Sequence, residues 1–545
     1  MNRSRVLIIG LDGADPDLVE AWIDHLPNLR EFFAQGVSGK LRSITPPVTC
    51  PAWISFATGK NPGTLGIYDW EDFQPPQKPG LSNWKVPRHL KIWQLLGNAG
   101  YKVGIVNVPL TYPPEPVNGI MIAGFPSPPS VKDYVYPPQL MRQISSIVGN
   151  YDPDPAGIIN PDYLEGGPRQ FLEEVDKASS NVFSCAKYLM GSFDWDFFMI
   201  TFMCLDQVQH YFWRYLDERH PDYRPREAEE FGSAILAVYK KIDNLLGSLL
   251  SLIDENACVF IMSDHGSGPQ YGNFAINEWL AQEGLLTLKS KRPLKNIVFS
   301  ILDSIFQKLL TSVLIRKTFR RFGWFRLGRR LVRRRFGLIN PENPLWAAQH
   351  LFEDTDWYRT KALGLSNGKI YLNKQVLSTK DQYERVREEV MSSLCEIRDP
   401  LTGKQAVSKL FTKEQLYGID CAGNPPDIIY FLGDLKYNQI SGIKSPSLWQ
   451  IPALRCGEHR LDGLYAAKGL YIKAGARINS RIIDLAPTIL HIFGLPVPED
   501  MDGRVLKEMF EDGSEPGKRE VKYRVWDEKD RIRNKIRKLR RSDKI

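Results

Sequence analysis

Residues 6–12 have the sequence VLIIGLD, in which six apolar or small residues run directly into an acidic one. The pattern recurs where FFMITFMCL at 197–205 precedes Asp206, and where CVFIM at 258–262 is followed closely by Asp264. Uninterrupted apolar runs of this length are typical of strands covered on both faces of a parallel sheet. We therefore predict three buried strands, each with an acidic residue at its carboxyl end.

Helical patterns at about 168–190 and 226–252 separate these strands. The alternation predicts an α/β protein with a doubly wound, mostly parallel central sheet, in which ligands bind beyond the carboxyl ends of the strands. The Pro-rich stretch 112–138 predicts a long ordered loop, either beside the site or across the surface. Downstream patterns predict further strands at 364–373, 427–431 and 470–473, and helices at 380–398 and 482–493.

The composition is that of an ordinary globular protein, because 43% of its 545 residues are hydrophobic and 25% charged. This excludes collagen-like, mucin-like and mostly disordered chains. The seven cysteines are odd in number and form no C-x-x-C pair, which favours a reducing compartment, the cytoplasm. No cleavage site follows the first apolar run, and no stretch of eighteen uncharged apolar residues occurs. We therefore expect neither a signal peptide nor a transmembrane helix.

Aspartate and histidine residues occur in polar contexts at the predicted strand ends and in two further segments. Carboxylate and imidazole ligands in this number suit two divalent cations, the arrangement that stabilises the attacking and leaving oxygens in phosphoryl transfer. Each residue alone is also typical of a turn or a core position, but only eight histidines exist in the chain, and the set as a whole favours metal binding. The set is Asp12, Asp206, His210, Asp264, His265 and His459.

Thr49 lies in a Pro-bracketed turn, PPVTCPAW at 46–53, that leads into a predicted helix. A threonine at a helix N-terminus is well placed to attack an anionic phosphate, because backbone N–H groups favour the anion and a metal lowers the hydroxyl pKa. A plain N-cap is the alternative interpretation.

Six motifs occur in an order that resembles the alkaline phosphatase superfamily. They are IIGLDG at 8–13, PPVTCPAWISFATGKNP at 46–62, LDQVQH at 205–210, SDHG at 263–266, GEHRLDGLYAAKG at 457–469 and DLAPTILHIFGLPVPEDMDGRVL at 484–506. The sequence is most similar to the type I phosphodiesterase/nucleotide pyrophosphatase group and its prokaryotic predicted phosphohydrolase/phosphomutase relatives. The resemblance covers roughly residues 5–285 and 340–506 and implies the alkaline-phosphatase-like fold.

The resemblance also implies a role for each site residue. Asp12, Thr49, Asp264 and His265 would bind one metal, with Thr49 as the nucleophile. Asp206, His210 and His459 would bind a second metal, which activates the water that hydrolyses a phospho-threonine intermediate. Zinc is the expected ion, and manganese would use the same ligands.

The sequence departs from the family pattern near Thr49. Nucleotide pyrophosphatases carry an asparagine that holds a phosphate oxygen, whereas the matching place here is Ala52 or Trp53. The sulfatase pattern is absent, because Pro51 follows Cys50 directly. No arginine adjoins Thr49 along the chain, which favours diesters over monoesters.

We therefore predict hydrolysis of a phosphodiester or pyrophosphate in a small-molecule or lipid-linked substrate. Two alternatives stay open. One is phosphoryl transfer to an alcohol, as in phosphomutases or head-group transferases, and the other is a non-catalytic protein that binds membrane surfaces.

Positive charge is concentrated in two segments. Residues 289–337 hold fifteen Lys or Arg and one acidic residue, and 518–545 hold thirteen and five, so the rest of the chain has a net charge of about −14. We predict one catalytic domain formed by 1–288 and 338–510, a helical basic insertion at 289–337 and a basic tail at 511–545. The amphipathic, Arg-rich insertion suits peripheral contact with an anionic membrane or packing on the acidic body, and nucleic acid is the least favoured partner.

Overall fold

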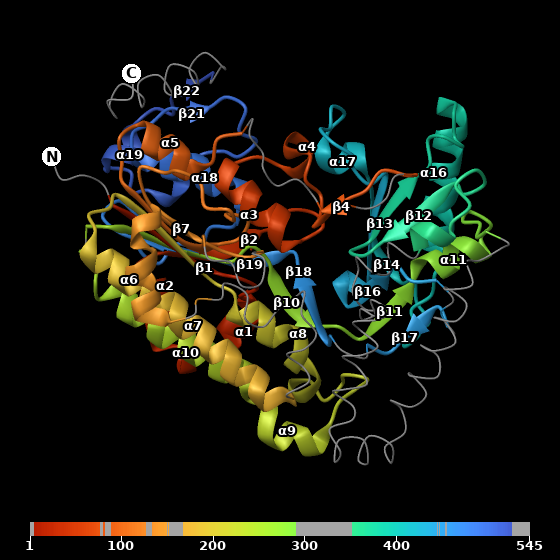
Figure 1. The fold of residues 1–545 in the computed structure, drawn as a ribbon, viewed down its shortest axis with the longest axis horizontal. Coiled ribbons are helices and arrows are strands. Elements are labelled where there is room, and N and C mark those ends of the chain that lie inside the picture. Colours follow the sequence, from red (N-terminus) through yellow and green to blue (C-terminus); the bar gives the residue numbers. More distant parts are fainter. Residues whose placement is uncertain are drawn as a thin grey trace.

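The computed structural model describes residues 5–76, 80–81, 89–126, 133–149, 151, 167–254, 256–289, 351–443, 445, 447–452 and 455–525 (Figure 1). Its central sheet has nine strands in the order β20-β2-β19-β9-β1-β8-β5-β6-β7. They are β1 (Val6–Leu11), β2 (Val37–Arg42), β5 (Val103–Val108), β6 (Gly119–Ala123), β7 (Val135–Tyr136), β8 (Phe197–Phe202), β9 (Cys258–Met262), β19 (Asp462–Lys468) and β20 (Ser480–Arg481).

The strands β9, β1, β8, β5 and β6 run parallel to one another, and β19 and β7 pair antiparallel with β9 and β6 at the two ends of this set. This confirms the mostly parallel α/β sheet. The three strands that the apolar runs predict are β1, β8 and β9, and every residue of each is buried. Strand β8 ends at Phe202, earlier than predicted, because the helix α8 (Cys204–Leu216) begins two residues later.

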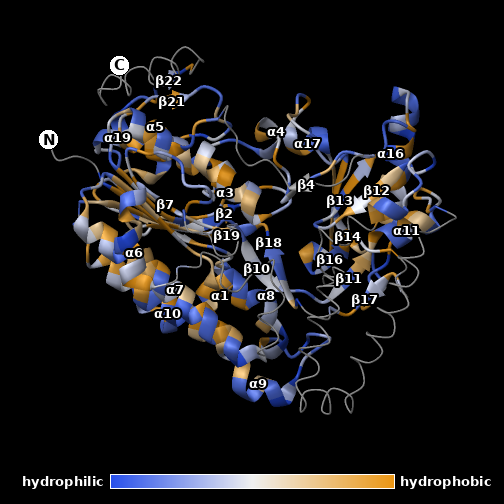
Figure 2. Cartoon of the chain, in the orientation of Figure 1, coloured by the Kyte–Doolittle hydropathy of each residue, from blue (hydrophilic) through white to orange (hydrophobic). Residues whose placement is uncertain are grey.

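Helices cover both faces of this sheet, as Figure 1 shows. Leu7, Ile9 and Leu11 pack with α2 (Pro27–Gln35), α7 (Gly167–Ser192), α8 and α10 (Ala234–Leu250). Val6 and Ile8 point the other way, toward α3 (Thr49–Thr58), α5 (Ile92–Asn98) and α18 (Leu485–Ile492). Alternate residues of one strand therefore supply two apolar cores, and Figure 2 shows apolar residues concentrated along the sheet.

A second, seven-stranded sheet lies beside the first and has its own apolar core (Figure 1). Its strands are β11 (Gly272–Ala275), β12 (Ala362–Leu365), β13 (Lys369–Leu372), β14 (Val407–Thr412), β15 (Ile428–Leu432), β16 (Tyr437–Ile440) and β17 (Trp449–Gln450). Among its helices are α11 (Ile276–Gln282) and α16 (Lys380–Cys395).

Three local predictions were wrong. The segment 364–373 is the hairpin β12–β13, because Asn367 and Gly368 take positive φ angles of 61° and 70° and form a tight turn. The stretch 112–138 is not one loop, since it contains β6 and β7. The segment 470–473 is not a strand, and Ile472 makes only an isolated bridge to Phe510.

The predicted basic insertion lies outside the described residues except for Lys289, and the tail is described only as far as residue 525. The two flanks of the gap meet, because the Lys289 backbone N–H donates to the Asp354 carbonyl at 2.9 Å. Within the described part of the chain, no helix combines the length and apolarity that crossing a bilayer requires.

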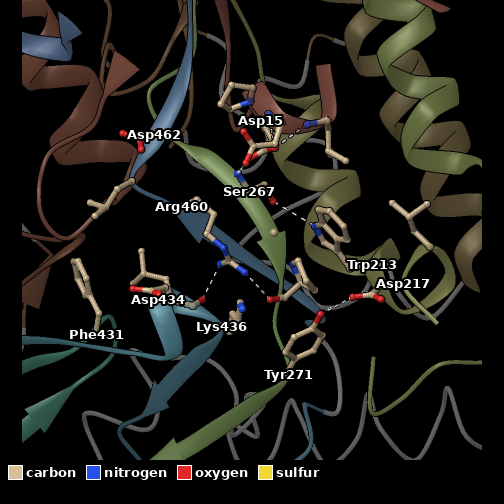
Figure 3. Close-up of a pocket in the computed structure, with 18 of the residues that line it drawn as sticks. Asp15, Trp213, Asp217, Ser267, Tyr271, Phe431, Asp434, Lys436, Arg460 and Asp462 are labelled. Atoms are coloured by element: carbon tan, nitrogen blue, oxygen red, sulfur yellow. Dashed lines mark hydrogen bonds between the residues drawn. The ribbon is translucent and has the colours of Figure 1, made fainter. Parts of the chain in front are cut away.

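The antiparallel ribbon of β10 (Gly266–Pro269) and β18 (Gly457–Arg460) connects the two sheets. Beside it lies a cavity of about 920 Å³ with walls from β2, β10, β15 and β18 (Figure 3). The partly buried Arg460 guanidinium donates from its two Nη atoms to the carbonyls of Leu435 and Pro269, both at 2.7 Å. Arg460 thereby ties the ribbon to the second sheet and fixes the position of His459 next to it.

Candidate active site

The carboxyl ends of three adjacent strands place the predicted acidic residues together. Asp12 follows β1, Asp264 follows β9, and Asp206 lies in the first turn of α8, just after β8. The Asp206 backbone N–H donates to the Asp12 carbonyl at 3.1 Å, which joins two of these strand ends directly. All three side chains are buried, with at most 1% of their surface exposed.

The other site residues come from separate elements. His210 follows Asp206 by one turn of α8, His265 follows Asp264, and His459 comes from β18. Thr49 is the first residue of α3, whose N-cap is Val48, and the Thr49 Oγ1 atom lies 3.2 Å from His265 Nε2. The alternative of Thr49 as a plain N-cap is therefore wrong. The fold brings all seven predicted residues into one buried cluster.

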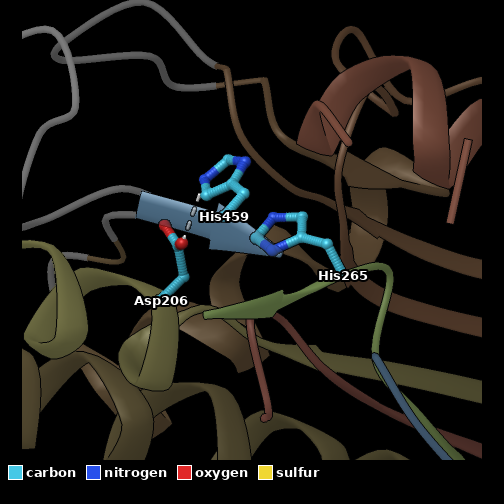
Figure 4. Close-up of side chains that lie close together, drawn as sticks. All are labelled: Asp206, His265 and His459. Atoms are coloured by element: carbon cyan, nitrogen blue, oxygen red, sulfur yellow. Dashed lines mark ion pairs between the residues drawn. The ribbon is translucent and has the colours of Figure 1, made fainter. Parts of the chain in front are cut away.

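Within this cluster the ligand atoms form two neighbouring groups. In one, His265 Nε2 lies 3.7 Å from Asp12 Oδ1 and 3.3 Å from Asp264 Oδ2. In the other, Asp206 Oδ1 lies 3.1 Å from His210 Nε2 and 3.3 Å from His459 Nε2. The His265 and His459 rings stack at 3.6 Å between their centroids, so the groups adjoin (Figure 4). Asp206, His265 and His459 also have ligand atoms within 4.8 Å of one another.

Backbone carbonyls set the tautomer of all three histidines. The Nδ1 atoms of His210, His265 and His459 lie 2.7, 2.9 and 2.7 Å from the carbonyls of Gly457, Gly266 and Pro47. Since a carbonyl only accepts, each Nδ1 carries a proton and each Nε2 is the nitrogen that faces the site. Burial lowers the pKa of His459, but the neighbouring Asp206 carboxylate outweighs it and raises that pKa above its usual value. Burial lowers the pKa of His265 to about 3, which also keeps that ring neutral. Such outer partners are typical of metal-binding histidines.

Two of the three carboxylates, those of Asp12 and Asp264, are also oriented by a hydrogen bond to one of their oxygens. Asp12 Oδ2 accepts from Trp53 Nε1 at 2.7 Å, and Asp264 Oδ1 accepts from the Gly13 N–H at 3.3 Å. Asp12 Oδ1, Asp264 Oδ2 and both oxygens of Asp206 accept no hydrogen bond from any described residue. Burial, followed by repulsion from neighbouring carboxylates, raises the pKa of Asp12 well above its usual value. Buried carboxylate oxygens without donors, together with imidazole Nε2 atoms that face them, form a set of ligands that fits divalent cations.

Three further residues of the site were not predicted from the sequence. Trp53 donates a hydrogen bond to Asp12, and Glu458, next to His459, has a carboxylate oxygen within 4.8 Å of a ring nitrogen of His210 and of His459. Arg455 forms a side-chain hydrogen bond with Tyr211. Burial alone would lower the Arg455 pKa. Attraction to Glu458, Tyr211 and Asp206 outweighs this effect, so the pKa lies above its usual value. Glu458 and Arg455 both lie in the RCGEHR segment around His459, and this adjacency was the only signal available in the sequence.

A buried Asp/His cluster at the carboxyl edge of a doubly wound sheet, with a hydroxyl at a helix N-terminus, defines a candidate metal centre of the phosphoester-hydrolase type. Residues 6–306, more than half of the chain, match the family described as type I phosphodiesterase/nucleotide pyrophosphatase. The chain belongs to this family, within the alkaline phosphatase superfamily, and is a phosphoric ester hydrolase.

Comparison with solved structures finds distant likenesses. Human ectonucleotide pyrophosphatase/phosphodiesterase 5 is 12% identical, with a TM-score of 0.48, and the murine protein is 12% identical, with a TM-score of 0.49. Each match covers 93% of this chain and 100% of the other. Comparison with curated proteins gives no match.

Proposed function

We propose that this protein is a metal-dependent phosphohydrolase that cleaves phosphodiester or pyrophosphate bonds with Thr49 as the nucleophile. The observation that supports this most directly is the position of the Thr49 hydroxyl, at the N-terminus of α3 and 3.2 Å from His265 Nε2 in a cluster of buried carboxylates. Membership in the phosphodiesterase family supports the diester or pyrophosphate substrate.

Two divalent cations fit the residues of the site. Asp12, Thr49, Asp264 and His265 would hold one, and Asp206, His210 and His459 the other. Bound cations would supply charge for the phosphoryl oxygens and lower the pKa of the Thr49 hydroxyl. Zinc is our first choice and manganese the second, because both accept imidazole and carboxylate ligands.

The other contributions to catalysis come from the residues of the chain. The N-terminus of α3 presents backbone N–H groups to an anionic phosphoryl group. The three Nδ1–carbonyl hydrogen bonds keep the imidazoles from rotating, and the burial of the carboxylates excludes bulk water from them. Thr49 is thus fixed near its partners before a substrate arrives.

The test compares hydrolysis of bis(p-nitrophenyl) phosphate and p-nitrophenyl phosphate with zinc or manganese present. Thr49→Ala should lower kcat/KM by at least about 100-fold, equal to about 2.7 kcal/mol of barrier. Thr58→Ala is the matched control, because Thr58 is a buried threonine at the other end of α3 whose hydroxyl bonds to the Ile54 carbonyl. The proposal fails if Thr49→Ala keeps the activity of Thr58→Ala.

The same assay separates the alternatives. Faster cleavage of the diester supports a phosphodiesterase. Faster cleavage of the monoester would instead favour a phosphomonoesterase in which Arg455 binds the dianionic phosphate. Release of nitrophenol together with phosphorylation of an added alcohol would assign a phosphomutase or head-group transferase. No cleavage by protein that has bound metal would favour the non-catalytic membrane-surface protein or a more selective substrate.

We also propose that residues 289–337 attach the protein peripherally to anionic membranes, where a lipid-linked phosphate ester would be accessible. Fifteen basic residues and the interleaved aromatics of that segment support this. A cytoplasmic location is supported by the cysteines, since all seven are free thiols.

A further inference from the structure

Trp53 lies one helical turn after Thr49 on α3, so the two side chains share one face of that helix. Its indole Nε1 donates to Asp12 Oδ2 at 2.7 Å. Trp53 and Asp12 are both fully buried, so no water competes for this hydrogen bond. A single helix therefore presents the candidate nucleophile and the donor that holds a candidate metal ligand.

The indole ring is held in place by its surroundings. A Cβ atom at Gly10, on β1, would lie 2.5 Å from the Trp53 Cη2 atom, so the glycine provides the space that the ring fills. The Phe56 ring packs edge-on against Trp53 at 6.1 Å between centroids. Because the ring cannot shift toward β1, the direction of its N–H group is fixed.

We propose that Trp53 is a positioning residue that sets the orientation of Asp12 for metal binding. With Oδ2 engaged by Trp53, the other oxygen, Oδ1, faces His265 Nε2 at 3.7 Å and accepts no hydrogen bond from the described residues. Asp12 thus offers one defined oxygen to the group formed with Asp264 and His265. This inference rests on the proposed two-metal function and extends it to a residue outside the ligand set.

The second metal group is held independently of Trp53. The Nδ1 atoms of its two imidazoles, His210 and His459, donate to the carbonyls of Gly457, on β18, and Pro47, in the turn before α3, and neither hydrogen bond involves the indole. Loss of the indole donor should therefore weaken one metal site and spare the other. Removal of such an outer partner typically lowers metal affinity about 10–100-fold.

The experiment is a calorimetric titration of metal-free protein with Zn²⁺, and separately with Mn²⁺, for wild type, Trp53→Phe and Trp93→Phe. Trp93 is the matched control, because it is also buried on the same side of the sheet and donates to a carboxylate, Glu115 Oε1, at 2.6 Å. We expect two sites in wild type and in Trp93→Phe, and a loss of about 10–100-fold in affinity at one site in Trp53→Phe.

Equal affinities in Trp53→Phe and Trp93→Phe would overturn the positioning role, and equal weakening of both sites would as well. Binding of fewer than two ions by wild type would instead contradict the proposed function. If Trp53→Phe does not fold, as judged by circular dichroism, benzothienylalanine at position 53 keeps the ring shape while sulfur replaces the N–H. The same selective loss is then expected, and unchanged affinity at both sites would refute the proposal.

Discussion

At the scale of single residues, the histidine tautomers are the most informative feature of the site. Each of the three site histidines uses Nδ1 toward a carbonyl, whereas His220 and His491, away from the site, use Nε2 toward the carbonyls of Gln270 and Pro516, both at 2.8 Å. The chain therefore contains both tautomers, assigned by the same physical rule. Of these five histidines, only the three at the site direct Nε2 toward a candidate cation position.

This difference predicts the nitrogen NMR spectrum of metal-free protein with labelled histidine at neutral pH. His210 and His265 should show protonated Nδ1, and His220 and His491 should show protonated Nε2, with assignments made by single His→Gln variants. The reason is that a carbonyl stabilises only the tautomer that donates to it. Protonated Nε2 at His210 or His265 would contradict the ligand geometry.

At the scale of elements, the turn after β1 decides how closely the strand ends approach. Gly13 has a φ of +69°, and its N–H donates to Asp264 Oδ1. A Cβ atom at this position would lie 2.9 Å from both Cα and Cβ of Asp206. A glycine is required here because α8 packs directly on the turn.

We expect Gly13→Ala to displace Asp206 and to lower the metal stoichiometry. Gly100→Ala is the control, because Gly100 also has positive φ, +96°, yet a Cβ atom added there would meet no described heavy atom within 4 Å. Both variants should lose about 1–3 kcal/mol of unfolding free energy from backbone strain, but only Gly13→Ala should lose metal. Denaturant unfolding and metal analysis measure the two effects. Full metal content in Gly13→Ala would disprove the expectation.

At the scale of the whole molecule, the second sheet packs against the segments around Thr49. The Tyr417 hydroxyl donates to the Thr45 carbonyl at 2.7 Å, and the Ala422 N–H donates to the Gly63 carbonyl at 2.8 Å. In addition, Lys369 on β13 forms a buried ion pair with Asp69, and the side chains are 1% and 7% exposed. The part of the chain around the second sheet is therefore joined to the segments on either side of Thr49 through an ion pair as well as through hydrogen bonds.

Replacing only Lys369 should lower the unfolding free energy more than replacing both partners of this ion pair. Lys369→Met removes the cation of this buried ion pair and should lower the unfolding free energy by about 3–5 kcal/mol. Adding Asp69→Asn should recover about 1–3 kcal/mol of that loss, because the buried negative charge that faced Lys369 is then removed as well. A double-mutant cycle in urea measures the coupling, and strictly additive losses would show that the pair does not act as a unit.

The flanks of the basic insertion make its membrane role testable without disturbing the site. Since Lys289 and Asp354 on the two flanks are hydrogen-bonded, residues 290–337 can be replaced by a short Gly-Ser linker. This variant should lose binding to phosphatidylserine vesicles at low salt, at about 1 kcal/mol per basic residue near the lipid. Hydrolysis of bis(p-nitrophenyl) phosphate should stay at the wild-type rate. Sedimentation with anionic and neutral vesicles measures binding, and unchanged binding would exclude the segment as the anchor.

The sequence by itself predicted three of the strands of the central sheet, β1, β8 and β9, and named the seven candidate site residues that the fold brings together. Continuous apolar runs specify strands buried on both faces, and the carboxyl ends of parallel strands meet at one edge, so Asp12, Asp206 and Asp264 had to be neighbours. The hairpin at 367–368 was also readable, because Asn-Gly favours that turn, although the continuous strand prediction overlooked it.

Only the tertiary structure decided which atoms face the site. The carbonyl partners of the imidazoles, the Trp53–Asp12 hydrogen bond and the approach of Arg455 and Glu458 depend on contacts between different elements. Their distances depend on how helices and strands pack, and packing is a property of the whole fold. The spacing of residues along the chain predicts which side chains are candidate ligands, because it sets which residues share a strand end or a helix face. It does not predict how the oxygen and nitrogen atoms of those side chains are oriented.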